Sequence, residues 1–337
     1  MIECVFTLDY EIYGNGTGAL ADLVYEPANR LIEIFRKWDA RFVAFLEVAE
    51  LEKIEEFGTD AAIELVRAQI EELYNDAFEI GLHLHPQWYN ARREGGSWVL
   101  DPAEYNLCRL PRERIAEIVA RSLDYLRYVV GQRKFTPLSF RAGNWLFQPT
   151  ATAAEVLLER GIKIDSSVFK GGLQHSHNLD YRAALKNGYY WRFTSDANKA
   201  DGNGPWLEFP IYTEMVPVWR MATSKRVGFA NSGSFGGRGW SGKANRLRDL
   251  MRFRYPRKFD FCRMTFDELK TMLERVIRED KEQPEVYRPL VAIGHTKDLT
   301  DPGTVDRLLA FLKAQQISVT TFEAIYPKVR QEVEQIA

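Results

Sequence analysis

The sequence is poor in cysteine and histidine and carries almost no net charge. Its three cysteines, Cys4, Cys108 and Cys262, are odd in number and lack the spacing of a metal site, so we expect free thiols in a reducing compartment. A formal net charge of -2 over 337 residues gives no overall case for binding nucleic acid. The N-terminal apolar run is short and contains an acidic residue, unlike a signal peptide or a membrane span. We therefore expect a soluble cytoplasmic protein.

The five histidines are placed unevenly, which makes them informative. His83 and His85 end an apolar run that begins at Glu79, and in an extended strand residues two apart point to the same face. Two imidazoles on one face suit a metal ion, although such a pair alone is more often two ordinary histidines. A second pair, His175 and His177, follows no strand-like run, and we interpret it as part of a surface loop rather than a second metal site.

Short apolar runs alternate with amphipathic helical segments along most of the chain. Strands are expected at residues 2–8, 41–46, 77–84, 137–140, 162–164, 289–293 and 317–321, and helices at 26–37, 61–75, 112–130, 150–160, 269–279 and 305–314. This alternation predicts an α/β fold, a distorted (β/α) barrel of about seven parallel strands. With 45% hydrophobic residues the chain can bury a large core, and we expect a single domain at 1–337.

Titratable side chains stand where the expected strands end. In parallel β/α barrels the carboxyl ends of the strands meet at one rim, and this rim holds the chemistry. Some polarity is expected at any strand end, but the set as a whole predicts one shared site. Its members are Asp9, Glu11, His83, His85, Arg141, Asp165 and His295.

Residues 220–263 differ from the rest of the chain in charge. They hold twelve basic residues and two acidic ones, and a loop rich in glycine and serine precedes an expected basic helix. The segment looks like an insertion in the barrel. Charge runs of this kind are usually solvated surfaces. The alternative is recognition of an anionic group, either the diphosphate of a nucleotide- or lipid-linked sugar or the acidic phospholipid of a membrane surface.

Five short segments resemble, in order, the five motifs of the polysaccharide deacetylases, the NodB-homology family of carbohydrate esterase family 4. The resemblance extends from residue 1 to about 325 and implies a distorted barrel that removes an N-acetyl group from a sugar with the help of a metal ion. Each motif alone is weak, but their order and their places at strand ends strengthen the match. The segments are Phe-Thr-Leu-Asp-Tyr-Glu at 6–11, Glu-Ile-Gly-Leu-His at 79–83, Phe-Arg-Ala-Gly-Asn-Trp at 140–145, Asp-Ser-Ser at 165–167 and Ile-Gly-His at 293–295.

The resemblance also implies catalytic roles. Asp9 would be the base that takes a proton from the attacking water, with Arg141 orienting it and keeping it ionised. His295 would protonate the departing amine. Asp165 would form a hydrogen bond to His295 and raise its pKa, so that His295 is protonated when needed.

The metal positions depart from the family pattern at two places. The family usually has a second Asp where this chain has Tyr10, and a second His where it has Gln87. We interpret Glu11 and His85 as the replacements, so that Glu11, His83 and His85 would hold one divalent ion. Zinc is the first choice, although cobalt, nickel or manganese would also suit mixed histidine and carboxylate ligands.

Aromatic and amide side chains beside the motifs are expected to contact the substrate, an N-acetylated sugar or glycan. They are Trp88, Trp145, Tyr10 and Asn144. A cytoplasmic deacetylase of this type would act in the synthesis of a surface polysaccharide such as lipopolysaccharide O-antigen or capsule. Two alternatives stay open if the replaced ligands do not bind metal. One is a metal-free hydrolase of another C–N bond, in a cyclic amide or ureide, and the other is a catalytically silent glycan-binding protein.

Overall fold

The structure is a computed structural model that describes residues 1–185, 188–221 and 253–334. Its centre is a nine-stranded sheet in the order β10-β11-β7-β6-β3-β2-β1-β14, with β15 also paired to β1. The strands of this sheet pair in parallel, except for β10 with β11. The strands are β1 (Ile2–Tyr10), β2 (Val43–Glu47), β3 (Glu79–Leu84), β6 (Ser139–Ala142), β7 (Ile164–Asp165), β10 (Trp191–Phe193), β11 (Trp206–Glu208), β14 (Arg288–His295) and β15 (Ser318–Thr320).

The sheet curls until its two ends meet. Ile211, shortly after β11, forms a parallel bridge with Val291 of β14, and the backbone N–H of Tyr212 donates to the carbonyl of Val291 at 3.0 Å. Single bridges rather than a full strand pair join the ends, so the barrel is closed but irregular. The predicted distorted (β/α) barrel is therefore confirmed.

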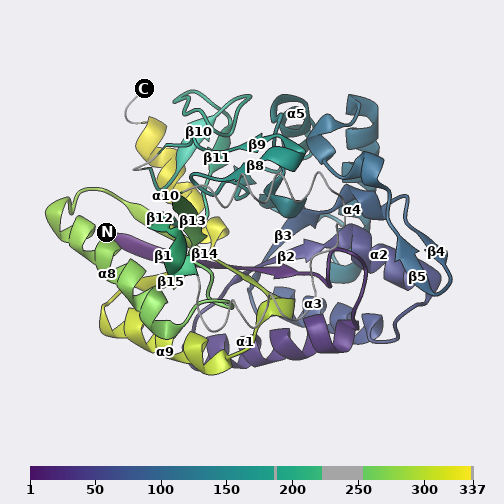
Figure 1. Ribbon diagram of the computed structural model, residues 1–337, viewed down its shortest axis with the longest axis horizontal. Coiled ribbons are helices and arrows are strands. Elements are labelled where there is room, and N and C mark those ends of the chain that lie inside the picture. The colour runs from purple at the N-terminus through teal and green to yellow at the C-terminus, as the bar shows by residue number, and fades with distance from the viewer. Residues whose placement is uncertain (186–187, 222–252, 335–337) are drawn as a thin grey trace.

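Helices cover the outside of the curled sheet. In Figure 1, α8, α9 and α1 follow one another along the lower side, and α9 contacts both of the others. Helix α1 forms because residues 28, 31, 32 and 35 are apolar and buried at helical spacing, with Pro27 in the first turn. The helices are α1 (Glu26–Lys37), α2 (Val48–Phe57), α3 (Ile63–Asn75), α4 (Arg112–Val130), α5 (Ala151–Glu159), α8 (Phe266–Glu282), α9 (Pro302–Ala314) and α10 (Phe322–Glu334).

Among the described residues, three antiparallel strand pairs lie outside the main sheet. The pairs are β4 (Arg92–Glu94) with β5 (Ser97–Val99), β8 (Leu173–Gln174) with β9 (Leu179–Asp180), and β12 (Thr213–Pro217) with β13 (Arg254–Lys258). Most of the expected basic insertion, residues 222–252, lies outside the described residues, and the single-domain organisation stays a prediction. Among the helices that the structure describes, none combines the length and the apolar character of a membrane span.

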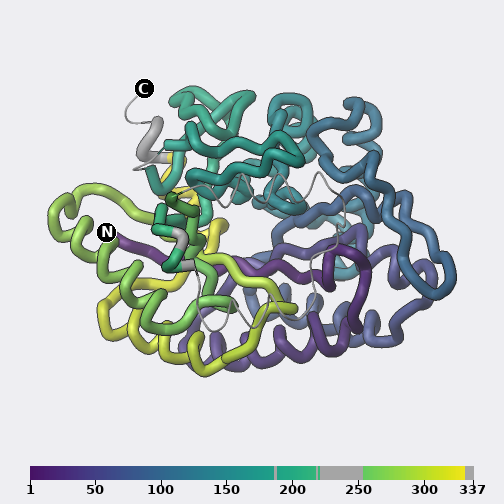
Figure 2. Tube along the Cα trace, viewed as in Figure 1, coloured from purple at the N-terminus to yellow at the C-terminus, as the bar shows by residue number. Residues whose placement is uncertain are grey.

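Strand β1 has the largest share of the sheet's contacts. β14 pairs with residues 2–9 on one edge, while the other edge is divided between β15, at residues 3–5, and β2, at residues 7–10. Figure 2 shows this purple strand beside the yellow-green chain of β14. The register sets Asp9 opposite His295, and in β3 and β6 it sets His83 opposite Arg141. The register of the paired strands thus places these motif residues side by side at the carboxyl ends of the strands.

Glu79 is a buried carboxyl at the start of β3, away from this rim. Its Oε2 accepts the backbone N–H of Glu323 at 2.8 Å, near the N-terminus of α10, and its Oε1 accepts the hydroxyl of Ser139 at 3.1 Å. Burial raises the pKa of Glu79 to about 8, because these hydrogen bonds do not replace the lost hydration of a charge. The carboxyl therefore binds its proton more tightly in the folded chain than in the unfolded chain.

We expect Glu79→Gln to flatten the pH dependence of stability. Between the unfolded pKa near 4.5 and the folded pKa of about 8, the folded state binds more protons, so the free energy of unfolding falls as pH rises. This slope, at most about 1.4 kcal/mol per pH unit, should be smaller in the variant when urea unfolding is measured from pH 5 to 8. Glu155→Gln on α5, which is exposed, is the control. Equal slopes in wild type and Glu79→Gln would contradict the assignment.

Candidate metal centre and active-site pocket

A cavity of about 730 Å³ opens at the carboxyl ends of the strands. Its lining includes seven of the residues expected from the sequence, while Arg141 lies fully buried beneath it. The structure therefore gathers residues that are up to 286 positions apart into one pocket. The expected residues in the lining are Asp9, Glu11, His83, His85, Asn144, Trp145 and His295.

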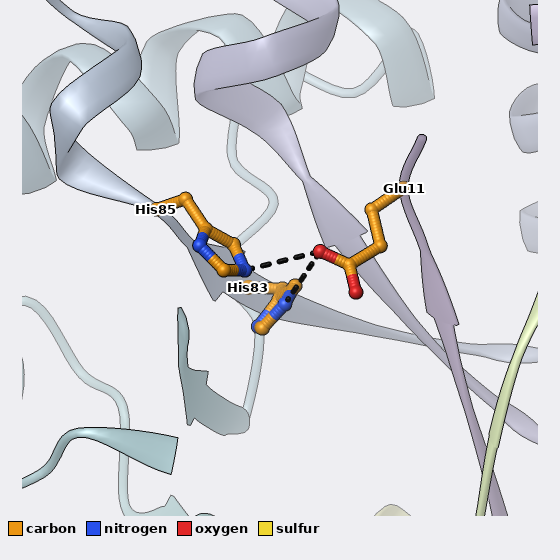
Figure 3. Close-up of side chains that lie close together, drawn as sticks. All are labelled: Glu11, His83 and His85. Carbon is orange, nitrogen blue, oxygen red and sulfur yellow. Dashed lines mark ion pairs between the residues drawn. The ribbon is translucent and has the colours of Figure 1, made fainter. Parts of the chain in front are cut away.

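Glu11, His83 and His85 form one of two groups of metal-type donors in the described part of the chain, and the other is Asp9, Glu11 and His295. The Oε2 atom of Glu11 lies 3.0 Å from Nε2 of His85 and 3.6 Å from Nε2 of His83 (Figure 3). The histidines share a face because they stand two apart at the end of β3, and Glu11 follows Asp9 at the same spacing. All three side chains are buried. A carboxylate and two imidazoles at this separation are a suitable donor set for one divalent ion.

The hydrogen bonding of His83 fits a metal ligand. Its Nδ1 lies 2.9 Å from the carbonyl oxygen of Arg141, so Nδ1–H donates there and Nε2 faces Glu11. Within the described residues this buried Nε2 has no hydrogen-bond partner. Burial lowers the pKa of His83, but the negative charges of Asp9 and Glu11 outweigh burial and raise the pKa to about 9. The position therefore favours positive charge, and the residues present fit a cation.

Glu11 is held as a charged carboxylate by a lysine that the sequence analysis missed. Lys297 lies in the 3-10 helix Thr296–Asp298, directly after β14, and its Nζ is 2.9 Å from Oε1 of Glu11 and 2.9 Å from the carbonyl of Ile12. Burial would raise the pKa of Glu11, but Lys297 and the two histidines beside the carboxylate hold the pKa well below its usual range. Its Oε1 is thus committed to Lys297, and its Oε2 faces the histidines.

Asp9 has the environment of an ionised base. Its Oδ1 accepts from the Arg141 guanidinium at 2.5 Å, and Arg141 also donates to the hydroxyl of Thr7 at 2.9 Å. Burial would raise the pKa of Asp9, but the positive charges of Arg141, His83 and His295 outweigh it and lower the pKa. Oδ2 lies 3.5 Å from Nε2 of His295. One carboxylate oxygen is therefore anchored, and the other is directed toward the pocket and His295.

The expected partner of His295 was wrong. Asp165, on β7, accepts from the hydroxyl of Ser167 at 2.6 Å, and β7 is not a neighbour of β14. The carboxylate at Nδ1 of His295 is Asp298, at 3.5 Å, because the short helix after β14 returns residue 298 toward residue 295. Arg263 holds Asp298 from the other side at 2.6 Å. A carboxylate three residues beyond the motif histidine was the sequence signal for this pair.

Two of the four expected substrate contacts were also wrong. Trp88 is only 1% exposed and packs edge to face against Trp98, and the side chain of Tyr10 is fully buried on the face of β1 opposite Asp9. Neither lines the cavity, whereas Trp145 and Asn144 do.

The second histidine pair lies at the surface, where His175 is exposed, but it forms a short 3-10 helix, His175–His177, after the two-residue strand β8. His177 lines the cavity, with its ring stacked on Tyr105 at 4.7 Å. Tyr105 had no motif to mark it in the sequence. The pocket wall therefore has an aromatic pair of a kind that suits the apolar face of a sugar.

Comparison with solved structures identifies the fold. A Mycobacterium smegmatis protein assigned to the polysaccharide deacetylases matches over 98% of this chain and 91% of its own, with a TM-score of 0.56 and 13% identity. The chain has the polysaccharide deacetylase fold. A Pseudomonas aeruginosa PAO1 protein with the same assignment matches over 96% of this chain and 89% of its own, with a TM-score of 0.50 and 12% identity. No family model and no curated protein matches the sequence.

Within this polysaccharide deacetylase fold, we expect Gly143→Ala to displace His85. A Cβ at residue 143 would lie 2.5 Å from the carbonyl oxygen of Leu84 and 2.7 Å from Cγ of His85, closer than real contacts allow. The metal affinity, measured by calorimetric titration with zinc, should fall about tenfold or more while the protein stays folded. Gly14→Ala at the rim of the same cavity is the matched control, since a Cβ there meets nothing within 4 Å. Unchanged affinity in Gly143→Ala would show that His85 is not a ligand.

Proposed function

We propose that the protein is a metal-dependent hydrolase that removes an N-acetyl group from a sugar. The observation that supports this most directly is the presence in one cavity of an anchored carboxylate, a facing histidine and a separate group of metal-type donors. Asp9 lies 3.5 Å from His295, and Glu11 lies within 3.6 Å of both His83 and His85. Amide hydrolysis requires a base, an acid and a means of polarising the carbonyl, and the pocket offers a candidate for each.

In the proposed mechanism Glu11, His83 and His85 would hold the ion. A divalent cation bound there supplies Lewis-acid chemistry, which polarises the acetyl carbonyl and acidifies water. Oδ2 of Asp9 accepts the proton of the attacking water, because Oδ1 is occupied by Arg141. As the C–N bond breaks, the amine takes a proton from Nε2 of His295, and the products are acetate and the free amino sugar.

His295 needs to be neutral before it can relay a proton. Burial lowers the pKa of His295 below its usual value, although Asp9 and Asp298 oppose this effect, so the expectation of a raised pKa was wrong. A neutral imidazole whose Nε2 faces Oδ2 of Asp9 can receive the proton that Asp9 takes from water. Asp298 then stabilises the imidazolium through Nδ1 until Nε2 gives the proton to the departing nitrogen.

We further propose that the ion is zinc, with cobalt, nickel or manganese as substitutes, and that the substrate belongs to the synthesis of a surface polysaccharide such as lipopolysaccharide O-antigen or capsule. Mixed histidine and carboxylate donors support the choice of ion. The three cysteines are free and buried, which supports a reducing, cytoplasmic location. The excess of basic residues in 220–263 supports a nucleotide- or lipid-linked sugar, or contact with a membrane surface.

One observation favours a second candidate, a metal-free hydrolase of another C–N bond. Lys297 already provides a cation 2.9 Å from Oε1 of Glu11 and lines the cavity. An ammonium group can stabilise negative charge on a substrate oxygen without a metal. A catalytically silent glycan-binding protein would use the aromatic wall alone.

Metal analysis separates these candidates. We expect purified wild type to carry one equivalent of metal by elemental mass analysis, and His83→Ala and His85→Ala to lose it, because each removes one of three donors. Hydrolysis of N-acetylated nucleotide sugars should stop after chelation and return with zinc. Hydrolysis of a cyclic amide or ureide that continues in chelator would instead support the metal-free enzyme. Sugar binding without turnover or metal would support the silent protein.

The His295 pair gives an independent test. Asp298→Asn should lower kcat by roughly ten- to a hundredfold with little change in KM, because it removes the charge that stabilises the imidazolium. Asp165→Asn is the matched comparison, since Asp165 bonds to Ser167 instead of His295, and we expect its effect to appear in the melting temperature instead of kcat. A larger loss of kcat in Asp165→Asn than in Asp298→Asn would instead support Asp165 as the carboxylate that acts on His295.

A further inference from the structure

Gln87 has an unusual position for a glutamine. It lies in the 3-10 helix Pro86–Trp88, directly after His85, with a side chain that is almost fully buried. Its Nε2 is 3.3 Å from Nδ1 of His85, while its Oε1 has no hydrogen-bond partner among the described residues. Buried polar atoms are nearly always paired, so an unpaired amide oxygen beside an imidazole requires an explanation.

The tautomer of His85 can explain the unpaired amide oxygen of Gln87. With the amide nitrogen at Nδ1, the ring accepts there and carries its proton on Nε2, where it can donate to Oε2 of Glu11 at 3.0 Å. A ring nitrogen that carries a proton cannot bind a metal. Rotating the amide by half a turn exchanges its oxygen and nitrogen without changing its shape. Oε1 of Gln87 then accepts the Nδ1–H of His85. The lone pair on Nε2 of His85 becomes available to a metal ion.

His83 and His85 differ in this respect. The Nδ1 of His83 faces a backbone carbonyl, that of Arg141, which can only accept, so its tautomer is fixed. A side-chain amide can serve either tautomer of His85. The backbone of His85 is itself fixed, because its N–H donates to Oε2 of Glu47 at 2.6 Å. The choice therefore concerns the ring nitrogens alone.

Asn144 is less suited to this role. Its Nδ2 also lies 3.3 Å from Nδ1 of His85, but its side chain has a second partner in the hydroxyl of Tyr105. It is only partly buried, so solvent can complete its hydrogen bonds. The buried amide of Gln87 has neither a second side-chain partner of this kind nor access to solvent, and its oxygen is the unpaired atom.

We propose that Gln87 is a positioning residue whose amide oxygen accepts the Nδ1 proton of His85 when metal is bound, and so stabilises the tautomer in which His85 binds the metal. The role of Gln87 in metal binding rests on the proposed metal-dependent function. The contact between its amide and the imidazole of His85 does not depend on that function. Gln87 thus supports His85 from the position at which the family pattern has a ligand. Acceptors at the outer nitrogen of a ligating histidine orient the ring and make it more basic.

Two substitutions separate an acceptor from a donor. Gln87→Leu removes both functions at similar volume and should weaken zinc binding, measured by competitive calorimetry, by roughly ten- to a hundredfold. Gln87→Glu can only accept and should bind zinc at least as tightly as wild type. Wild-type affinity in Gln87→Leu, or equal losses in both variants, would overturn the proposal. Gln69→Leu on α3 is the control for loss of a buried glutamine, since Gln69 bonds to Tyr25 and Asn29 far from the cavity.

A second readout needs no metal. Nitrogen-15 spectra of histidine-labelled, metal-free protein report which ring nitrogen carries the proton. We expect Nδ1 of His85 to carry more of the ring's proton in Gln87→Glu than in metal-free wild type, because a carboxylate at residue 87 can only accept. An unchanged His85 spectrum in Gln87→Glu would refute the inference whether or not the protein binds metal. Absence of metal in wild type together with the expected spectral change would refute only the proposed function.

Discussion

The site depends on one buried ion pair, Asp9 with Arg141. Both side chains are shielded from solvent, and their strands, β1 and β6, are separated in the sheet by β2 and β3. A charge in such a place is costly unless it is paired and fully hydrogen-bonded, and removing one partner of such a pair costs about 3–5 kcal/mol. Arg141 meets this condition through Asp9, Thr7 and Ser166. Its own carbonyl also holds His83, so one residue fixes both the proposed base and a candidate metal ligand.

Around this pair, two further carboxylates of the proposed site each have a cationic partner. Glu11 is paired with Lys297, and Asp298 with Arg263. Lys297 helps to hold the pKa of Glu11 well below its usual range, whereas burial alone would raise it. The contrast with Glu79 is direct, because that carboxyl has hydrogen bonds but no cation, and its pKa is raised to about 8. Charge pairing rather than burial therefore distinguishes Asp9 and Glu11 from Glu79.

The sequence predicted the elements that hydrophobic periodicity marks. It failed for residues whose position depends on a turn or on which face of a strand they occupy. Helices α1 and α4 have the predicted bounds because both show apolar residues at helical spacing. A proline in the first turn marks the start of α1, and a glycine after the last turn marks the end of α4. Helices α2 and α10 were missed. The register of the parallel strands then brings the motif residues together without further information. Tyr10 was misplaced because strand alternation turns it away from Asp9, and Asp298 was missed because only the turn after β14 brings it to His295.

The two departures from the family pattern have a common physical form. On β1, alternation places residue 10 in the core, so a carboxylate on the face of Asp9 must be at 11, and Glu11 is there. At the end of β3, the same alternation places His85 on the face of His83, and Gln87 lies in the helix beyond. Loss of a metal site by drift would be expected to scatter such donors. Here both replacements lie within 3.0 Å of each other, with a lysine beside one and an amide beside the other. Two donors at this distance, each with a polar partner, favour an intact site over a decayed one.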